Sequence, residues 1–514
     1  MRRFTSHFAL IGLFLLASGC GTAAPDSTLT SAPESLSGPA WAHDEPAAGF
    51  AASPSAAEVA GTSGPGSDIV RSEDPRHKSG TTHDRDRPRA EKPLRRQDRP
   101  SGQLTAGSID DVERSAEFCQ FLDQALASGL FAGVVKDARP RVMLHVTTPD
   151  GLPIGGAELT VETPAGQGSV LQLTTGSDGR AMLSVSDLDV QAQLCQVTVR
   201  PPDGSRPVRR ELSFEKEVCR IVVDDYEAQR PQQLDLALII DTTGSMGDEL
   251  EYLKAELDDI VARLRETFPN VDQRFALIVY RDQGDEYVSR RFDFTRSLDD
   301  LRGELSRQRA AGGGDMPEAV HVALEQAAGL DWRPGNVARV AFLVGDAPPH
   351  DCDILAAFEA TIGLRAGGVR LYPVASSGID LKAEFVMRSA AFLTMGQYLF
   401  LTDHSGIGNA HAKPHTSQYF VEHLDQLMVR MITSELCGRR LQPDEVLAIE
   451  RGDMALPYGP GPILPGQEQD LQGTPQSQRA ASLSLPEGTG LWLTLGAALL
   501  GVCVYDSIRS RQEA

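Results

Sequence analysis

The sequence predicts two folded parts, an all-β sandwich followed by an α/β domain with a doubly wound, mostly parallel sheet. In residues 138–226, short segments such as VMLHVTT and AELTVET alternate apolar and polar positions, and turn signals such as PDG and SDG separate them. In residues 232–437, nearly continuous apolar strands alternate with helical patterns. Strands of this second kind are buried on both faces, which indicates a parallel sheet covered by helices.

The composition of the chain limits the number of domains and the classes of function that it can have. The chain has 514 residues, enough for two or three domains, and 41% of them are apolar, which is ordinary for a globular core. Its 48 glycines and 32 prolines indicate long segments outside regular structure. The formal net charge of −22 argues against a general nucleic-acid binder, because such proteins need basic residues to neutralise phosphates. Acidity instead favours solubility and local cation sites.

Residues 1–20 have the pattern of an export signal. Arg2 and Arg3 precede an apolar run, and the small residues of ASGC follow it. The cysteine after these small residues resembles the lipidation site of bacterial lipoproteins, which implies that Cys20 becomes the lipid-bearing first residue. A plain signal peptide is the alternative. Both predict an exported protein of the bacterial cell envelope, where disulfides form.

Two segments precede the sandwich. Residues 21–107 are rich in Ala, Pro, Ser and Gly and then become highly charged, which predicts a disordered tether. Its stretch RDRPRAEKPLRRQDRP could also touch anionic lipid or cell-wall polymer. Residues 108–137 predict a helix, because Ser108 can cap it and apolar residues such as Phe118 and Leu122 partly share a face.

Six cysteines follow Cys20. Cys195 and Cys219 flank one strand–turn–strand stretch and are the favoured disulfide pair, and Cys352 with Cys437 is the second candidate. Spacing alone does not fix the connectivity. The sequence has no CxxC motif and no Cys/His cluster with zinc spacing.

The α/β domain opens with the strand LDLALII and continues with FALIVYR, VARVAFLVG, VRLYPVA and QYLFL. Helices are expected at 247–267, 317–329, 353–366, 380–392 and 418–436. Ligands of such sheets bind beyond the carboxyl ends of the strands. Asp241 and Asp346 stand at two of these ends, so the sequence predicts a site there.

The C-terminal part contains a second membrane candidate. Residues 438–488 are rich in Pro, Gly and Gln and predict a linker. The apolar run within residues 489–507 is shorter than the ~20 residues that span a bilayer, but Trp492 and Tyr505 would suit the two interfaces. We interpret it as a membrane helix. A cleaved sorting tail and a helix buried against a partner are the alternatives.

The stretch IIDTTGSMG contains the candidate residues of the functional site. A single helix cap would need one hydroxyl and does not explain Asp241, Thr243 and Ser245 at alternate positions. A phosphate loop would need GxxxxGK[ST], which is absent. A nucleophilic Ser245 is a third interpretation, because TGSMG nearly matches GxSxG.

That third interpretation requires an acid and a histidine from other strand ends, and the sequence offers Asp346 with His350, or Asp403 with His404. A metal site explains the stretch better. Three hard oxygens on one side of an extended loop suit Mg²⁺, which prefers octahedral oxygen ligands at ~2.1 Å. Neutral hydroxyls leave the cation electrophilic and ready to accept a partner's carboxylate.

LDLALIIDTTGSMGDE resembles the first strand and metal loop of a von Willebrand factor type A domain, whose site is the metal-ion-dependent adhesion site. The resemblance continues through AAGGGDMPEAV and VARVAFLVGDAPPH. It implies that Asp241, Thr243 and Ser245 hold Mg²⁺, or Mn²⁺ or Ca²⁺, and that Asp346 contributes from a later loop. Adhesive members commonly carry threonine where this chain has Asp315, so Asp315 is the expected substitute. A direct Asp315 ligand would lower the affinity for an acidic partner.

Further residues surround this site. Asp282 and Asp285 in YRDQGDE, and His350 after Asp346, are rim candidates, with solvated loop charges as the alternative. In the sandwich, PDGLPIGGAELTV with GSDGRAMLSV resembles the carboxypeptidase-regulatory-like and immunoglobulin-like modules of exported bacterial proteins. That resemblance implies a spacer or adhesive support.

The sequence therefore predicts a lipid-anchored envelope protein that binds an acidic side chain of a protein partner through a divalent cation. We expect no catalytic residue and no nucleic-acid partner. A hydrolase that uses Ser245 or the metal is the alternative from another class. A structural protein with an empty metal loop is the third.

Overall fold

The computed structural model describes residues 102–129, 141–163, 170–184, 194–214, 217–314, 316–405, 411–416 and 419–459. Two compact units divide the chain, residues 1–88 and 89–514, and every described residue belongs to the second. The export signal with Cys20, most of the expected tether, Asp315 and the C-terminal apolar segment lie outside the described residues. Within the described ranges, no helix combines the length and apolar character that a membrane crossing needs.

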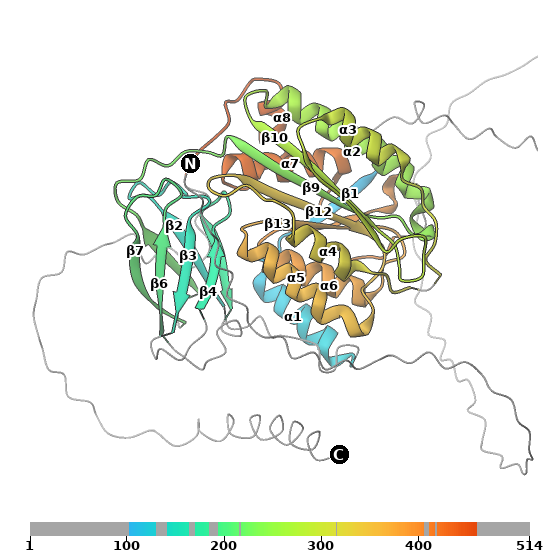
Figure 1. The fold of residues 1–514 in the computed structure, drawn as a ribbon, viewed down its shortest axis with the longest axis horizontal. Coiled ribbons are helices and arrows are strands. Elements are labelled where there is room, and N and C mark those ends of the chain that lie inside the picture. The colour runs from blue at the N-terminus through green and yellow to red at the C-terminus, as the bar shows by residue number, and fades with distance from the viewer. Residues whose placement is uncertain are drawn as a thin grey trace, which may run out of the picture. The chain divides into compact units, whose positions relative to one another are not determined.

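The larger domain is built on an eight-stranded sheet with the order β11-β10-β9-β12-β13-β14-β1-β15 (Figure 1). Its parallel strands are β9 (Gln233–Asp241), β10 (Asp272–Tyr280), β12 (Ala338–Gly345), β13 (Arg370–Ala375) and β14 (Tyr398–Leu401). They are almost entirely buried, as their unbroken apolar sequences require. The predicted mostly parallel, doubly wound sheet is confirmed.

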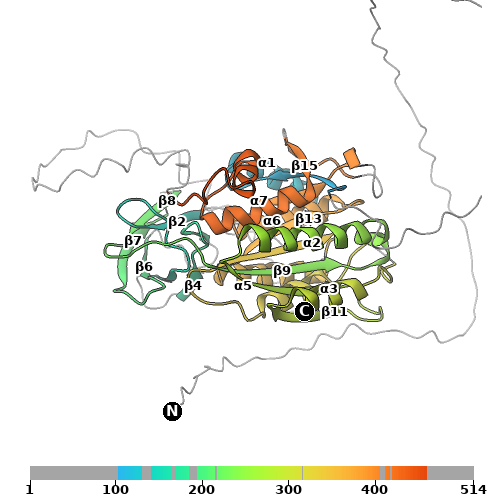
Figure 2. The ribbon, with the colours of Figure 1, turned by 90° about the horizontal axis from the view of Figure 1, so that it is seen from above.

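Helices cover both faces of this sheet (Figure 1). One face carries α2 (Gly247–Thr267), α3 (Leu298–Arg307), α7 (Leu424–Cys437) and α8 (Pro443–Glu450). The other carries α4 (Val320–Ala328), α5 (Ile354–Ala366) and α6 (Leu381–Leu393). Buried leucines at positions 250, 253, 257 and 264 give α2 its apolar stripe. α2 and α7 lie side by side, joined by the Arg263–Asp425 ion pair (Figure 2).

The sheet edges differ from the prediction. β11 (Ser289–Thr295) pairs antiparallel with β10, and its exposed arginines and aspartate protect that edge from further pairing. At the other edge, β15 (Val421–His423) occupies the start of the segment expected to be helical from residue 418. β11 and α3 were not predicted from the sequence. The linker predicted over residues 438–488 is corrected at its start, because α8 lies within it and buries Val446 and Ile449 against the core.

The first described strand belongs to the larger domain. β1 (Thr105–Ile109) pairs antiparallel with both β14 and β15, so the sandwich is inserted between β1 and β9. The expected tether boundary at residue 107 and helix over residues 108–137 are therefore corrected. Residues 105–109 form a strand, α1 spans Ser115–Ala127, and residues 130–140 lie outside the described residues. Gly107 fits here because a Cβ would lie 2.5 Å from the Phe400 ring.

The inserted module is a two-sheet sandwich, as predicted. Its three-stranded sheet has the order β5-β2-β8, and its four-stranded sheet has the order β4-β3-β6-β7. Their apolar faces share one core. The strands are β2 (Arg141–Thr147), β3 (Glu158–Glu162), β4 (Val170–Thr174), β5 (Arg180–Ser184), β6 (Leu194–Arg200), β7 (Val208–Ser213) and β8 (Val218–Val222).

Polar side chains join the sandwich to the larger domain. The Ser177 hydroxyl donates to Glu435 Oε2 at 2.6 Å, and Arg370 forms an ion pair with Asp178. The Tyr372 hydroxyl donates to the other carboxylate oxygen of Glu435 at 2.8 Å. Glu435 therefore links the end of α7 to both β13 and the sandwich.

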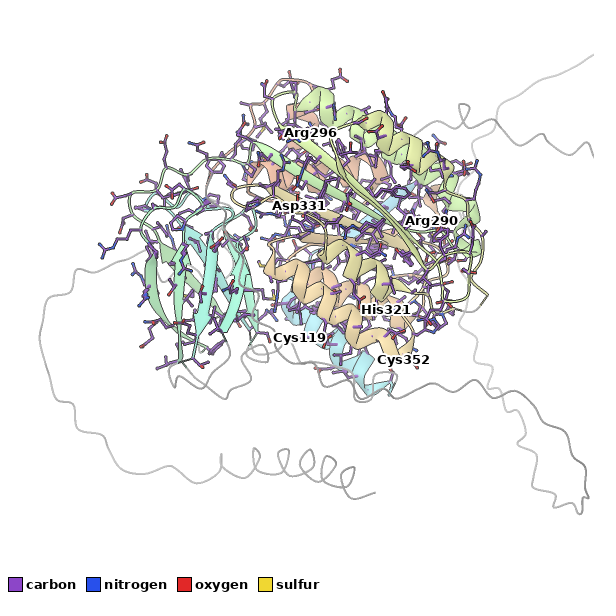
Figure 3. The ribbon with its side chains drawn as sticks, in the orientation of Figure 1. Cys119, Arg290, Arg296, His321, Asp331 and Cys352 are labelled. Carbon is purple, nitrogen blue, oxygen red and sulfur yellow. The ribbon has the colours of Figure 1, made fainter. Side chains whose placement is uncertain are left out.

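Neither predicted disulfide is formed in the structure, because Cys195 and Cys437 carry free thiols. Cys352 is exposed in the segment before α5, beyond the carboxyl end of β12 (Figure 3). Cys437 is buried at the end of α7, where Gly438 follows and approaches the Ser177 carbonyl. The two lie at opposite ends of the sheet. Burial raises the pKa of the Cys195 thiol to about 11, with a contribution from Cys219 nearby in the same core.

Candidate metal centre

The loop after β9 gathers three oxygen-bearing side chains. The Thr243 backbone N–H and hydroxyl both donate to Asp241 Oδ1, at 2.8 and 2.6 Å. The Thr243 and Ser245 hydroxyl oxygens lie 3.2 Å apart. Asp241 and Thr243 are fully buried and Ser245 is exposed. The group is therefore anchored at the end of β9 and opens to solvent at Ser245.

Asp346 brings a second carboxylate from the neighbouring strand. It follows β12, which pairs parallel with β9, so both acids lie at the same edge of the sheet. Asp241 Oδ2 and Asp346 Oδ1 are buried and have no hydrogen-bond partner among the described residues. Burial and the charge of Asp346 raise the pKa of Asp241 to about 7, although hydrogen bonds from Thr243 oppose the shift. Burial also raises the pKa of Asp346.

The floor of the site is formed by Tyr280 and Gly345, the last residues of β10 and β12. A Cβ at Gly345 would lie 2.5 Å from the Tyr280 hydroxyl and 3.3 Å from Asp241 Oδ2. The glycine therefore leaves room for the buried Tyr280 side chain beside Asp241. Burial and the nearby charges of Asp241 and Asp346 raise the pKa of Tyr280, so its hydroxyl stays protonated.

Glu318 is a third buried acid at this site, and it was not predicted from the sequence. It is 2% exposed, and its Oε2 has no hydrogen-bond partner among the described residues. A Cβ at Gly313 would lie 2.9 Å from Glu318 Oε1 and 3.3 Å from Thr243 Cβ, which places the carboxyl beside the metal loop. The Glu318 backbone N–H donates to the Pro348 carbonyl at 2.9 Å. The acid thus lies between the glycine segment 312–314 and the loop that follows β12.

The pKa of Glu318 is consistent with a position beside the other acids of the site. Burial, followed by the charges of Asp241, Asp282, Asp285 and Asp346, raises the pKa of Glu318 to about 9. The predicted helix at residue 317 concealed this residue, because α4 begins only at Val320. An acid directly after Pro317 and before an apolar helix was the signal that could have identified it.

The rim candidates have partners of their own. His350 Nε2 lies 2.7 Å from Asp282 Oδ1. Asp285 Oδ2 accepts the backbone N–H groups of Asp282 and Gly313, at 3.1 and 2.9 Å. Gly312 has a φ of +81°, and a Cβ there would lie 2.3 Å from the Asp285 carboxylate. Asp285 therefore anchors the glycine loop, whereas Asp282 forms a pair with His350. Asp315 follows this loop and lies outside the described residues.

The histidines pair differently from the triads that the sequence offered. Asp403 contacts His411, whose Nδ1 lies 2.8 Å from Asp403 Oδ1. His350 contacts Asp282. In the part of the chain that the structure describes, the Ser245 hydroxyl contacts Thr243 and Asp346, not a histidine.

The donors suit a hard divalent cation. Within the described ranges, no three His, Cys, Asp or Glu side chains form a compact metal cluster by themselves. The site instead combines carboxylates with the hydroxyls of Thr243 and Ser245, which are ligands that Mg²⁺ and Ca²⁺ accept. Buried charges in proteins are paired or coordinate metals. A cation would satisfy the unpartnered oxygens of Asp241, Glu318 and Asp346, so these residues fit the metal that the sequence predicts.

Residues 235–371 match the family described as von Willebrand factor A domain. The chain contains a von Willebrand factor A domain. This match begins inside β9 and ends inside β13, so it includes the metal loop, Glu318 and Asp346. The resemblance inferred from the sequence is confirmed for this domain.

Two curated relatives share part of the chain. An ariadne-like RING finger protein of Acanthamoeba polyphaga mimivirus is 38% identical over 117 residues, which are 23% of this chain and 11% of that protein. The alpha-protein kinase vwkA of Dictyostelium discoideum is 28% identical over 173 residues, which are 33% of this chain and 27% of that protein. The chain thus spans about a tenth and about a quarter of these relatives.

Solved structures resemble the chain only in part. BatB from Bacteroides thetaiotaomicron is 13% identical, with a TM-score of 0.28 and coverage of 40% of this chain and 98% of BatB. The pilus adhesin SpaC from Lactobacillus rhamnosus GG is 9% identical, with a TM-score of 0.29 and coverage of 48% and 32%. Proximal thread matrix protein 1 from the mussel byssus is 20% identical, with a TM-score of 0.26 and coverage of 32% and 41%.

Proposed function

We propose that the von Willebrand factor A domain binds a protein partner through a divalent cation, Mg²⁺ or alternatively Mn²⁺ or Ca²⁺. One observation carries the proposal: three acids beside the metal loop, Asp241, Glu318 and Asp346, each have a buried carboxyl oxygen without a hydrogen-bond partner among the described residues. Ionisation of these groups while they are buried and unpaired is costly, and the pKa of each is raised accordingly. A bound cation removes that cost.

Each residue has a defined part in this proposal. Asp241 and Asp346 would hold the cation from adjacent strand ends. Thr243 and Ser245 would add hydroxyl oxygens. Glu318 would approach from the segment between residue 314 and α4. The cation supplies positive charge and a coordination position open to a partner's oxygen. Ser245 lies on the exposed side, so a partner reaches the cation past this hydroxyl.

The proposed partner group is an acidic side chain. The exposed side of the site presents the neutral Ser245 hydroxyl, and His350 accompanies the rim acid Asp282. Glu318 weakens the attraction of the site for an acidic partner, because an added carboxylate ligand neutralises part of the positive charge of the cation. We therefore expect a weaker attraction for acids than at a site made mainly of hydroxyls. We also propose that the protein is exported and held at the bacterial cell envelope through Cys20 and the C-terminal apolar segment.

Calorimetric titration of the full chain with MgCl₂ and MnCl₂ tests the proposal. We expect binding by the native chain, loss of binding by Asp241→Ala, and at least tenfold weaker binding by Ser245→Ala, which leaves the strand intact. Asp331→Asn is the matched control, because Asp331 is fully exposed and away from the loop. Absence of binding heat in the native chain would support the structural alternative with an empty loop.

Partner binding needs a second measurement. Envelope proteins captured by the immobilised chain should be released by a chelator, and the Ser245→Ala chain should not capture them. A hydrolase would behave differently: Ser245→Ala would abolish esterase or phosphatase turnover while metal affinity is retained. That result would favour the enzyme over the binding module.

A further inference from the structure

A second polar network lies at the same edge of the sheet, beside the proposed metal ligands. His411 is at its centre. Its Nδ1 lies 2.8 Å from Asp403 Oδ1, and its Nε2 lies 3.3 Å from Glu249 Oε1. Its backbone N–H also donates to Asp403 Oδ1 at 2.9 Å. The imidazole therefore lies between two carboxylates.

These carboxylates come from different loops. Glu249 is buried in the first turn of α2, four positions after Ser245, and it accepts the Ser377 backbone N–H at 3.1 Å. Ser377 follows β13, and Asp403 begins the short helix η5 (Asp403–Ser405) after β14. One histidine thus connects the loops that follow β9, β13 and β14.

We propose that His411 is a positioning residue of the metal site: as an imidazolium it clamps the loop after β14 to the first turn of α2 and so fixes the metal loop. Its role at the metal rests on the proposed function. The clamp itself does not, because its contacts are made between protein groups alone.

The charge state follows from the geometry. His411 Nδ1 is hydrogen-bonded to Asp403, whereas Nε2 lies at ion-pair distance, 3.3 Å, from Glu249 Oε1 and forms no hydrogen bond with it. Two carboxylates on opposite sides of the ring favour the imidazolium, because only the charged ring is attracted to both. The charged groups that face the network are Glu249 from α2, Asp403 and His404 from η5, and Asp346, which interacts with Glu249. Burial alone would lower the pKa of His411, but Glu249 and Asp403 outweigh it and raise that pKa.

Deprotonation of His411 would remove the charge of the ring and with it the ion pair to Glu249. Glu249 would then lose its counter-charge beside Asp346, and the turn that carries the metal loop would lose its link to the segment after β14. The clamp is therefore closed at acidic pH and opens as the pH rises through the raised pKa of His411. Partners that support a metal ligand typically change metal affinity 10- to 100-fold when they are lost.

The clamp is tested first without metal. Thermal unfolding of the full native chain and of His411→Gln is compared in a chelator between pH 5.5 and pH 8.5. A raised folded-state pKa stabilises the fold below the unfolded-state value and loses this effect as the pH rises. We expect the native chain to have the higher midpoint at pH 5.5 and the gap to close at pH 8.5. A gap that is equal at all pH values overturns the clamp.

The link to the metal is tested by Mn²⁺ titration over the same pH range. Ionisation of Asp241 raises the affinity of both chains as the pH rises. We expect this gain to be about tenfold smaller in the native chain than in the His411→Gln chain, because only the native chain loses the clamp on the alkaline side. His423→Gln is the matched control, because His423 is an exposed histidine of β15. Identical profiles for the native chain and His411→Gln overturn the positioning role. If the native chain binds no Mn²⁺, the positioning role and the proposed function both fail. The difference in unfolding midpoint between the native chain and His411→Gln in a chelator then tests the clamp by itself.

Discussion

Asp241 and Asp346 lie at the carboxyl ends of two adjacent parallel strands, and each keeps one buried oxygen without a hydrogen-bond partner among the described residues. The strands β9 and β12 would pair without these acids, since their core is apolar. Two buried carboxylates placed so closely repel each other when both are ionised. The arrangement is therefore costly for the empty protein and suited to a cation.

The first prediction concerns pH. Burial and Asp346 raise the pKa of Asp241 to about 7, so the folded chain binds a proton that the unfolded chain releases near pH 4. Stability in a chelator should therefore fall as the pH rises from 4 to 7. Mg²⁺ should reverse this, and we expect a larger Mg²⁺-induced rise of the unfolding midpoint at pH 8 than at pH 5.5.

Asp241→Asn separates the two effects. In a chelator at pH 7.5 it should unfold at the same temperature as the native chain or higher, because the repulsion from Asp346 is removed. Mg²⁺ should no longer raise its midpoint. A Mg²⁺ effect as large as that of the native chain would contradict the assignment of Asp241 as a ligand.

The second prediction concerns Glu318. Because its pKa is raised to about 9, Glu318 is protonated at neutral pH without metal, and Glu318→Gln should change the unfolding midpoint in a chelator very little at pH 7.5. Its Mn²⁺ affinity should fall about tenfold, since the amide cannot supply a carboxylate. Differential scanning fluorimetry and calorimetry check these results. Equal Mn²⁺ affinity in both chains would remove Glu318 from the ligand set.

The third prediction concerns the floor of the site. Gly345→Ala would place a methyl group 2.5 Å from the Tyr280 hydroxyl, so the free energy of unfolding should fall by about 1–3 kcal/mol. Removing that hydroxyl in Gly345→Ala/Tyr280→Phe should restore part of the loss. Urea unfolding of both variants and of Tyr280→Phe measures this coupling, and additive losses would argue against the contact.

The fourth prediction concerns the link between the sandwich and the von Willebrand factor A domain. Glu435→Ala leaves Arg440 and Tyr372 without their buried carboxylate partner, which should cost about 3–5 kcal/mol. Ser177→Ala removes only the bond from the sandwich and should cost about 1 kcal/mol. Limited proteolysis should cut Glu435→Ala fastest. Equal protection of all three chains would show that this carboxylate does not stabilise the junction.

The metal loop could be predicted because its chemistry is local. Asp241, Thr243 and Ser245 follow one strand within five positions, and strand direction alone places Asp346 at the same edge. Glu318 could not be assigned in this way, because its place depends on a bridge to Pro349 in another loop. The separation of Cys352 from Cys437 likewise depends on tertiary geometry that cysteine spacing does not contain.

β1 shows the same limit in the fold. TAGSI has no clear strand pattern, and it becomes a strand because Ala106 pairs with Leu401, nearly three hundred positions later. Its small residues fit between β14 and β15 because Gly107 admits the Phe400 ring. Strand propensity and hydrophobic period depend only on neighbouring residues. They therefore cannot predict a strand that forms because of partners far away in the sequence.

The insertion of the sandwich after β1 decides how the protein would carry tension. A pull applied ahead of residue 102 reaches β1 first, and β1 is bonded on both sides within the sheet that presents the metal loop. The load therefore enters the cation-bearing sheet directly and bypasses the sandwich. Because β1 is antiparallel to β14, its first residue, Thr105, lies at the same edge as the metal loop. In a molecule anchored ahead of residue 102, the β14–β1–β15 hydrogen bonds would be the first to bear the pull.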